Sequence, residues 1–102
     1  KNIKTYFIDQ LETKTIKNIK KLIPKQDLII DDGLHQPDAN INVILDLLDH
    51  LNPNGILVIE DIEPSFVHIF KIIEKIYNNS DSYKSSLIKM RNGYCLLIQN
   101  LR

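Results

Sequence analysis

Several residue types that would assign this chain to a class of protein are scarce. Its single cysteine, Cys95, excludes an internal disulfide framework and suits a reducing compartment, so we expect a cytoplasmic location. Neither sign of charge is in excess, since 13 basic residues stand against 13 acidic ones. The apolar runs are far shorter than the ~20 residues that cross a bilayer. Composition therefore predicts neither nucleic acid nor a membrane as a partner.

The residues that are present suit one small globular domain. The chain has 102 residues, of which 43% are hydrophobic, and this is enough for a single core. No signal-peptide pattern opens it. The sequence starts with lysine and not with methionine, so we expect it to be a fragment of a longer protein.

Hydrophobic patterns along the chain predict alternating strands and helices. Short apolar runs predict strands at 3–8, 27–31, 56–59, 83–90 and 94–101. Helical spacing and helix-stop signals predict helices at 11–23, 37–51 and 64–77. The last two strands flank an Asn-Gly pair and form a predicted hairpin. The order β-α-β-α-β-α-β-β predicts an α/β fold with three layers, a mostly parallel sheet and an antiparallel hairpin at one edge.

The helical spacing also predicts which residues face the core. In the helix at 37–51 the predicted buried residues are Ile41, Ile44, Leu45, Leu48 and Leu51. In the helix at 64–77 they are Phe66, Ile69, Phe70, Ile73, Ile76 and Tyr77. Both stripes are expected to pack on the sheet.

Acidic residues follow two of the predicted parallel strands. Asp31 and Asp32 come after the first, with His35 three residues further on, and Glu60 and Asp61 come after the second. Ligands bind outside the carboxyl ends of parallel strands, so we expect these side chains to share one crevice. Crowded carboxylates repel one another, and a hard cation such as Mg²⁺ relieves that repulsion. The pattern predicts a metal site beside a histidine that can take a proton from a hydroxyl group.

The same residues resemble a known family. Residues 27–35 read Asp-Leu-Ile-Ile-Asp-Asp-Gly-Leu-His, and residues 51–62 read Leu-Asn-Pro-Asn-Gly-Ile-Leu-Val-Ile-Glu-Asp-Ile. This joint pattern resembles class I S-adenosylmethionine-dependent methyltransferases, and more narrowly the metal-dependent sugar O-methyltransferases of macrolide biosynthesis. The resemblance implies a partial Rossmann-like methyltransferase fold. Leu34 stands where that family has serine, and Asn54 stands where it has glycine. Asparagine suits such a turn because it can adopt the left-handed conformation.

The resemblance implies a catalytic role for each acidic strand end. It implies Asp32, Glu60 and Asp61 as ligands of Mg²⁺ or another divalent cation, and His35 as the general base. The implied reaction is metal-assisted methyl transfer from S-adenosylmethionine to a hydroxyl of a small molecule such as a sugar.

The resemblance also implies residues that contact the methyl donor. Asp31 would lie near the amino-acid end of S-adenosylmethionine. Asp9 and Gln10 match the acidic residue and glutamine that follow the third strand of the family, where the acid lies near the adenine.

The part of the family that cradles the methyl donor has no counterpart here. The family carries a glycine-rich loop after its first strand, but none of the three glycines of this chain belongs to a Gly-x-Gly turn. We therefore expect residues 1–102 to be a single domain, the C-terminal part of a methyltransferase catalytic domain from strand three to strand seven. The N-terminal donor-binding part would be absent. The activity would belong to the parent protein, and this fragment alone would be inactive.

That absence leaves the predicted first strand, residues 3–8, without its family neighbours. It would either pair directly beside residues 27–31, giving the sheet order 3-4-5-7-6, or be covered by a partner chain. The second arrangement would favour a homo-oligomer through the exposed sheet edge.

Each functional interpretation has a structural alternative. Asp31 and Asp32 could cap the end of their strand, and Asp9 could cap the following helix as readily as it could contact adenine. For the whole chain, the alternative to an enzyme is a non-catalytic, truncated or degenerate methyltransferase-like module that acts in assembly or regulation. A phosphate-receiver domain also clusters acidic residues, but it expects an acidic pair after its first strand.

Overall fold

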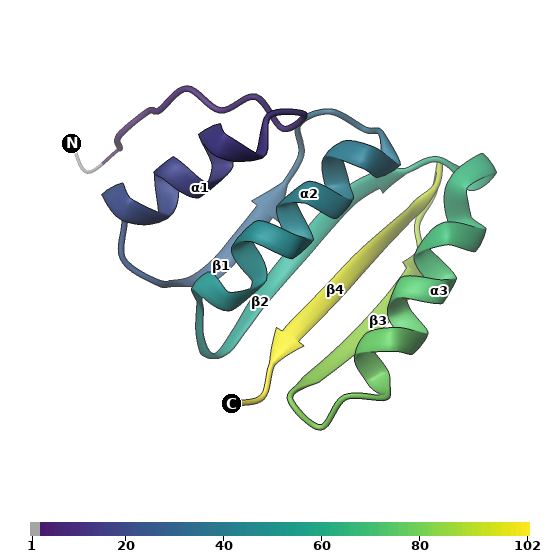
Figure 1. The fold of residues 1–102 in the computed structure, drawn as a ribbon. Coiled ribbons are helices and arrows are strands. Elements are labelled where there is room, and N and C mark those ends of the chain that lie inside the picture. Colours follow the sequence, from purple (N-terminus) through teal and green to yellow (C-terminus); the bar gives the residue numbers. More distant parts are fainter. Residues whose placement is uncertain (1–2) are drawn as a thin grey trace.

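The computed structural model describes residues 3–102, and its centre is a sheet of four strands in the order β1-β2-β4-β3 (Figure 1). The strands are β1 (Gln26–Asp31), β2 (Leu51–Ile62), β3 (Tyr83–Lys89) and β4 (Tyr94–Asn100). β1 and β2 are parallel, whereas β2 with β4 and β3 with β4 are antiparallel. The predicted α/β fold and closing hairpin are confirmed. The prediction of a mostly parallel sheet is wrong, because only one of these three pairs is parallel.

The helices are α1 (Thr13–Leu22), α2 (Pro37–Leu47) and α3 (Val67–Asn78). Short 3₁₀ turns lie at Leu48–His50, after α2, and at Pro64–Phe66, before α3. All three helices cover the same face of the sheet (Figure 1), so the prediction of three layers is wrong for the described residues. For α2 and α3 the reason is the order of the strands. The connection from β1 to β2 and the connection from β2 to β3 both move toward the β3 edge of the sheet. Right-handed crossovers with one direction place their helices on one face.

The core lies between this helical layer and one face of the sheet. Leu57 and Ile59 of β2 are fully buried there, as are Leu96 and Ile98 of β4. Phe70 of α3 packs into the same cluster. Alternate residues of each strand point to opposite faces, so the neighbours of these core residues point away from the helices.

The opposite face of the sheet is uncovered in the part of the chain that the structure describes. Leu28 and Ile30 of β1 each keep 54% of their surface exposed, and Ile56 and Val58 beside them are only partly buried. Strands of a parallel pair are normally buried on both faces. This apolar face therefore lacks the cover that a complete α/β fold would give it.

Residues 3–8 form no strand, so the predicted first strand is wrong, and so is the sheet order that began with it. The segment runs along the helical layer beside α1 (Figure 1), and Ile3 and Phe7 are exposed. Ile16 anchors α1 in the core, which draws the preceding segment away from the edge of β1. A strand needs hydrogen-bonding neighbours, and this position offers none within the described chain.

The predicted buried stripes of two helices are partly wrong. Leu45 in α2 is 69% exposed and Ile76 in α3 is 59% exposed, whereas Ala39 and Val43 are buried. Both helices carry apolar residues around more than one side, so the spacing alone does not decide which side meets the sheet. Within the described residues no helix is both long and apolar enough to cross a membrane.

Candidate functional site

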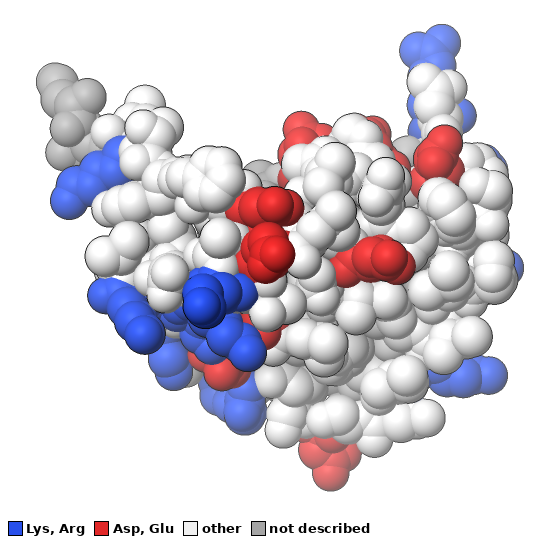
Figure 2. All heavy atoms as spheres, turned by 45° about the horizontal axis from the view of Figure 1, so that its top comes forward, with Lys and Arg blue, Asp and Glu red and all other residues white. Residues whose placement is uncertain are grey.

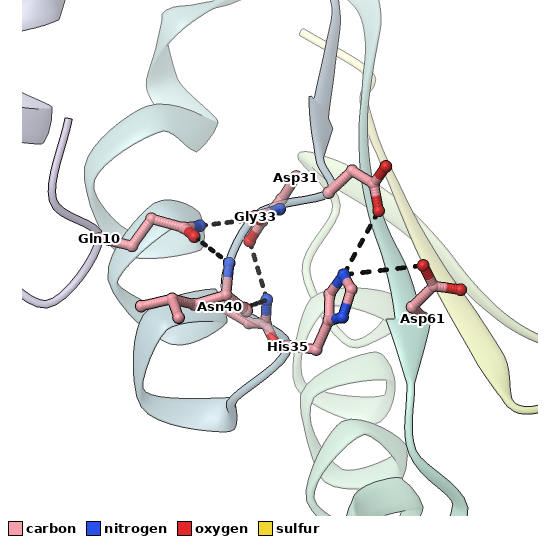
Figure 3. Close-up of polar contacts among 8 residues, drawn as sticks. Gln10, Asp31, Gly33, His35, Asn40 and Asp61 are labelled. Atoms are coloured by element: carbon pink, nitrogen blue, oxygen red, sulfur yellow. Dashed lines mark hydrogen bonds and ion pairs between the residues drawn. The ribbon is translucent and has the colours of Figure 1, made fainter. Parts of the chain in front are cut away.

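Three predicted site residues converge where β1 and β2 end. Asp31 of β1 is paired with Ile59 of β2, so the segments after both strands lie at one edge of the sheet. Nε2 of His35 lies 3.4 Å from Oδ1 of Asp32 and 3.6 Å from Oδ2 of Asp61. Figure 3 shows the imidazole of His35 facing the carboxylate of Asp61, which lies near the end of β2, whereas Asp32 directly follows β1. Parallel pairing thus brings together the residues that the strand-end argument selected.

The backbone of Asp61 adopts a conformation that only a few residue types tolerate. Its φ is 56°, in the left-handed region, and it lies where the pairing of β2 with β4 shifts register between Ile59 and Ile62. Asp is one of the residues that visits this region, although at some cost. Such strain often accompanies a functional side chain that must be aimed in one direction. Here the irregularity accompanies the approach of Asp61 to His35.

The donor atoms of this cluster suit a hard divalent cation. One atom from each of Asp32, His35 and Asp61 lies within 4.8 Å of the others, and all three residues are exposed. Across residues 3–102, neither carboxylate has a lysine or arginine within ion-pair distance. Exposed lysines instead gather at one side of the molecule, over α1 (Figure 2). Carboxylate oxygens without a basic partner, beside an imidazole, are a ligand set that Mg²⁺ or Mn²⁺ accepts.

Glu60, a further predicted ligand, is not among the three residues of this cluster. It lines a cavity of about 240 Å³ together with Asp61, Cys95 and the hairpin turn around Gly93. Burial raises the pKa of the Cys95 thiol, and the charge of Glu60 raises it further. Because neighbouring strand residues alternate between faces, Glu60 points to the uncovered face and does not join His35. The structure therefore brings Asp32 and Asp61 together without Glu60.

Asp31 has a different environment from Asp32. Its carboxylate is buried and accepts hydrogen bonds from Gln10 Nε2 (2.7 Å), Asn40 Nδ2 (2.8 Å) and the backbone N–H of Gly33 (3.2 Å). The Gln10 side chain also accepts a bond from the backbone N–H of Leu34. This network, visible in Figure 3, fixes the loop that carries Asp32 and His35. Buried carboxylates need such partners, because an unsatisfied one is costly.

Sequence reasoning missed Asn40. It lies in α2 and keeps only 3% of its surface exposed. A polar residue directly after Ala39, on the side of the helix that faces Asp31, was the available signal. The helix face could not be chosen from spacing alone, so that signal could not be used.

The residues predicted to contact the methyl donor divide into two groups. Gln10 and Asp31 line a cavity of about 280 Å³ along the outer edge of β1, together with Asp32. Asp9 instead stabilises a turn before α1: its carboxylate accepts a bond from the backbone N–H of Leu11, and its own N–H donates to Thr15 Oγ1. The structure thus places Gln10 and Asp31 next to Asp32 and gives Asp9 a structural contact.

Comparison with known proteins gives these features a context. The chain is 29% identical over 69 residues to the 8-demethyl-8-α-L-rhamnosyl tetracenomycin-C 2′-O-methyltransferase of Streptomyces olivaceus. This alignment spans 68% of the chain and 18% of that protein. The chain is related to S-adenosylmethionine-dependent O-methyltransferases of sugar and macrolide substrates. The family resemblance predicted from the strand-end motifs is confirmed. No protein-family model matches the chain.

Solved structures show the same fold. The chain superposes on the methyltransferase MycE of the mycinamycin biosynthetic pathway, in complex with Mg, SAH and mycinamycin VI, with a TM-score of 0.72. The match covers 97% of this chain and 32% of MycE, at 21% identity. A second crystal form of MycE with Mg and SAH gives a TM-score of 0.73 at 19% identity. The chain therefore spans about a third of MycE and a smaller share of the tetracenomycin enzyme.

Proposed function

We propose that this chain is the metal- and acceptor-binding part of an S-adenosylmethionine-dependent O-methyltransferase. The observation that carries the proposal is the convergence of Asp32, His35 and Asp61 at the carboxyl ends of two parallel strands. Its relation to sugar and macrolide O-methyltransferases supports the reaction class. The MycE complex supports the cofactors, since that protein binds Mg and SAH.

Each residue of the cluster has a proposed role. Asp32 and Asp61 would hold the divalent cation. A bound cation lowers the pKa of a hydroxyl that contacts it, which prepares the oxygen for methylation. Nε2 of His35 would take the hydroxyl proton, and its exposure leaves it accessible to an acceptor. Glu60 stays a proposed third ligand, with weaker support because its side chain lies beside Cys95.

The methyl donor would contact the other side of the loop. Gln10 and Asp31 line the cavity at the free edge of β1, next to Asp32. The uncovered sheet face with Leu28 and Ile30 supports the proposal that the chain is the C-terminal part of a catalytic domain, because a donor-binding half would cover it. Methyl transfer would then require that half, and the chain alone would be inactive.

The proposed acceptor is a hydroxyl group of a small molecule such as a sugar. Two relatives support this class: one is a tetracenomycin 2′-O-methyltransferase, and the other binds mycinamycin VI. Leu34, which is 41% exposed, borders His35 in the chain. An apolar side chain at that position suits the hydrophobic part of such an acceptor.

Calorimetric titration of the chain with Mn²⁺ and Mg²⁺ tests the metal site. We expect one site, and Asp32→Asn or Asp61→Asn should weaken binding about tenfold or more, because each removes one charged ligand. Glu60→Gln should weaken it less. Asp81→Asn, which changes an exposed acid in the turn before β3, is the matched control and should leave binding unchanged. Equal binding by all variants would refute the site and favour a non-catalytic module.

A further inference from the structure

A cavity of about 240 Å³ adjoins the metal cluster on the side of Asp61. Its lining comes from Glu60 and Asp61 near the end of β2 and from residues 90–95, which form the turn between β3 and β4 and the start of β4. β3 runs in the same direction as β1 and β2, so this turn lies at the carboxyl ends of those strands (Figure 1). Asp61 therefore belongs to both the cluster and the cavity.

The cluster connects this cavity with the one proposed for the methyl donor. Asp32 lines the donor cavity and Asp61 lines the cavity at the turn. Nε2 of His35 lies 3.4 Å from the carboxylate of Asp32 and 3.6 Å from that of Asp61. Methyl transfer needs the acceptor oxygen and the leaving sulfur on opposite sides of the methyl carbon. With the donor on the side of Asp32, the cavity on the side of Asp61 is the place for the acceptor.

The apolar groove between α2 and α3, of about 340 Å³, is a weaker candidate for the acceptor. Its lining comes only from these two helices and holds neither a cluster residue nor a charged one. A ligand pocket needs a few polar groups that fix the orientation of its ligand. The cavity at the β3–β4 turn has such groups, and one of them is a residue of the cluster itself.

A close approach of the turn to β2 fixes the position of its side chains. A Cβ atom at Gly93 would lie 2.5 Å from the carbonyl oxygen of Ile62, so a side chain there would push the turn away. The backbone N–H of Met90 donates a hydrogen bond to the carbonyl oxygen of Gly93 (2.7 Å), which closes the turn. Tyr94 pairs with Ile62, the residue after Asp61. The turn is thus held beside the segment that carries Asp61, and such preorganisation lowers the cost of binding a ligand.

Arg91 gives the turn a free group of hydrogen-bond donors. It is exposed, and within residues 3–102 it takes part in no ion pair, although two carboxylates line the same cavity. A guanidinium carries five N–H donors in a planar fork, which can bind two neighbouring oxygens at once. Met90, which is 52% exposed, adds an apolar contact beside it. Neighbouring hydroxyl groups on a partly apolar ring, as in a sugar, match this combination.

The charges around the cavity favour a neutral acceptor. Asp32, Glu60 and Asp61 are balanced by Arg91 together with a divalent cation, so the loaded site has no excess positive charge that would attract an anion. Hydroxyl groups can donate to a carboxylate and accept from a guanidinium, so they satisfy both kinds of group in the lining. The lining therefore suits a neutral group with several hydroxyls.

We propose that the cavity at the β3–β4 turn binds the methyl acceptor, and that Arg91 holds two neighbouring hydroxyl groups of a neutral sugar there. This inference rests on the proposed function and deepens it. The acceptor oxygen forms its bond to the methyl carbon while the carbon–sulfur bond of the donor breaks. The electron pair of that bond stays on the sulfur, and the hydroxyl proton goes to Nε2 of His35. Arg91 binds the acceptor and takes no part in these bond changes.

Nuclear magnetic resonance titration of the isotope-labelled chain with methyl α-L-rhamnopyranoside, a neutral sugar with neighbouring hydroxyl groups, tests the cavity. We expect shifts of the backbone amides of residues 90–95 and of Asp61. Arg91→Ala should raise the dissociation constant about fivefold or more, because it removes hydrogen bonds from a charged group. Arg102→Ala is the matched control. It removes the other arginine, which bonds to Asn100 and Tyr83 after the far end of β4, and should leave the constant unchanged.

Three results would overturn the proposal. They are an unchanged spectrum at about 50 mM rhamnoside, well above the dissociation constants of weak ligands, shifts confined to the residues that line the donor cavity, and equal binding by the wild type and Arg91→Ala. Urea denaturation checks that each variant is folded.

Glucuronate probes the preference for a neutral ligand, because it is a sugar that carries a carboxylate. In the presence of Mg²⁺ it should bind more weakly than the rhamnoside. Equal or tighter binding of glucuronate would show that the cavity accepts an anion and would refute the neutral class.

The variant Asp32→Asn separates this proposal from the proposed function. Asp32 does not line the cavity at the turn, so this variant should lose metal binding and still bind the rhamnoside. A wild-type chain that binds the rhamnoside but no metal would refute the metal site alone. A chain that binds metal but not the rhamnoside would refute the acceptor cavity alone.

Discussion

The imidazole of His35 lies 3.6 Å from the carboxylate of Asp61, although His35 comes after β1 and Asp61 lies near the end of β2. Neither segment could form this contact alone. It depends on the parallel pairing of β1 with β2 and on the left-handed backbone of Asp61. The contact makes the role of His35 an experimental question, because an imidazole at this position could either bind a cation or take a proton.

Replacing His35 by glutamine separates these two roles. If Asp32 and Asp61 hold the cation and His35 acts as a base, His35→Gln should change the Mn²⁺ dissociation constant by less than about threefold. Titration calorimetry measures this, with Asp32→Asn as the variant that should lose binding. A loss as large as that of Asp32→Asn would make His35 a ligand and would refute its proposed role as the base.

The backbone of Asp61 predicts that substitutions there change stability and metal binding independently. Asp61→Gly relieves the cost of a positive φ, so the free energy of unfolding should stay equal or rise by up to about 1 kcal/mol. Asp61→Val should lower it by about 1 kcal/mol or more, because a β-branched residue resists this conformation. Both variants should lose metal binding. Urea denaturation measures stability, and a marked loss in Asp61→Gly would show that the side chain is needed for folding.

The side chain of Gln10 leaves no room for a side chain at Gly33. A Cβ atom at Gly33 would collide with the carboxamide of Gln10, which is held by Asp31 and by the backbone of Leu34. Gly33→Ala should therefore displace Gln10 and cost about 1–2 kcal/mol through the lost hydrogen bonds. In a Gln10→Ala background the same change should cost much less, because the obstacle is gone. Additive effects in this double-mutant cycle would contradict the collision.

The raised pKa of Tyr77 predicts that the free energy of unfolding falls at alkaline pH. Burial raises the pKa of Tyr77 above its ordinary 10.0, and the neighbouring Tyr83 raises it further. The folded chain therefore holds this proton more tightly than the unfolded chain. The contribution of Tyr77 to the free energy of unfolding is fully present below about pH 10, and it is lost as the pH rises through the pKa of Tyr77 in the folded chain. Tyr77→Phe should show a smaller fall between about pH 9 and pH 11 than the wild type. Tyr6→Phe, at an exposed tyrosine, serves as the control. Identical pH profiles for wild type and Tyr77→Phe would contradict the prediction.

The sequence predicted the strand-end motifs and the closing hairpin because both depend on local patterns. Short apolar runs that end in acidic residues identify β1 and β2, and the turn around Gly93 separates β3 from β4. Asn54, in the first half of β2, has a positive φ of 67°, the left-handed conformation that was predicted for an asparagine in this position. These features depend on residues close together in the chain, where spacing and conformational preference are enough.

Long-range relationships were decided by the tertiary structure. Residues 3–8 have the composition of a strand, but pairing depends on a neighbour that local sequence cannot supply. Leu45 and Ile76 have the spacing of core residues, yet the packing angle of their helices leaves them exposed. Glu60 and Asp61 are adjacent in sequence and line one cavity, but only Asp61, at the register shift of β2, comes close to His35.

The sequence by itself therefore determined which residues end the parallel strands and the chemistry that they can perform. Only the tertiary structure decided that Asp32 and Asp61 meet at His35, that Asn40 secures Asp31, and that a groove lies between α2 and α3. The physical reason is the range of the interactions. Strand and turn preferences act over a few residues, whereas the approach of Asp61 to His35 and the groove between α2 and α3 join segments that are distant in the chain. These segments meet only after the sheet has paired and the helices have packed on it.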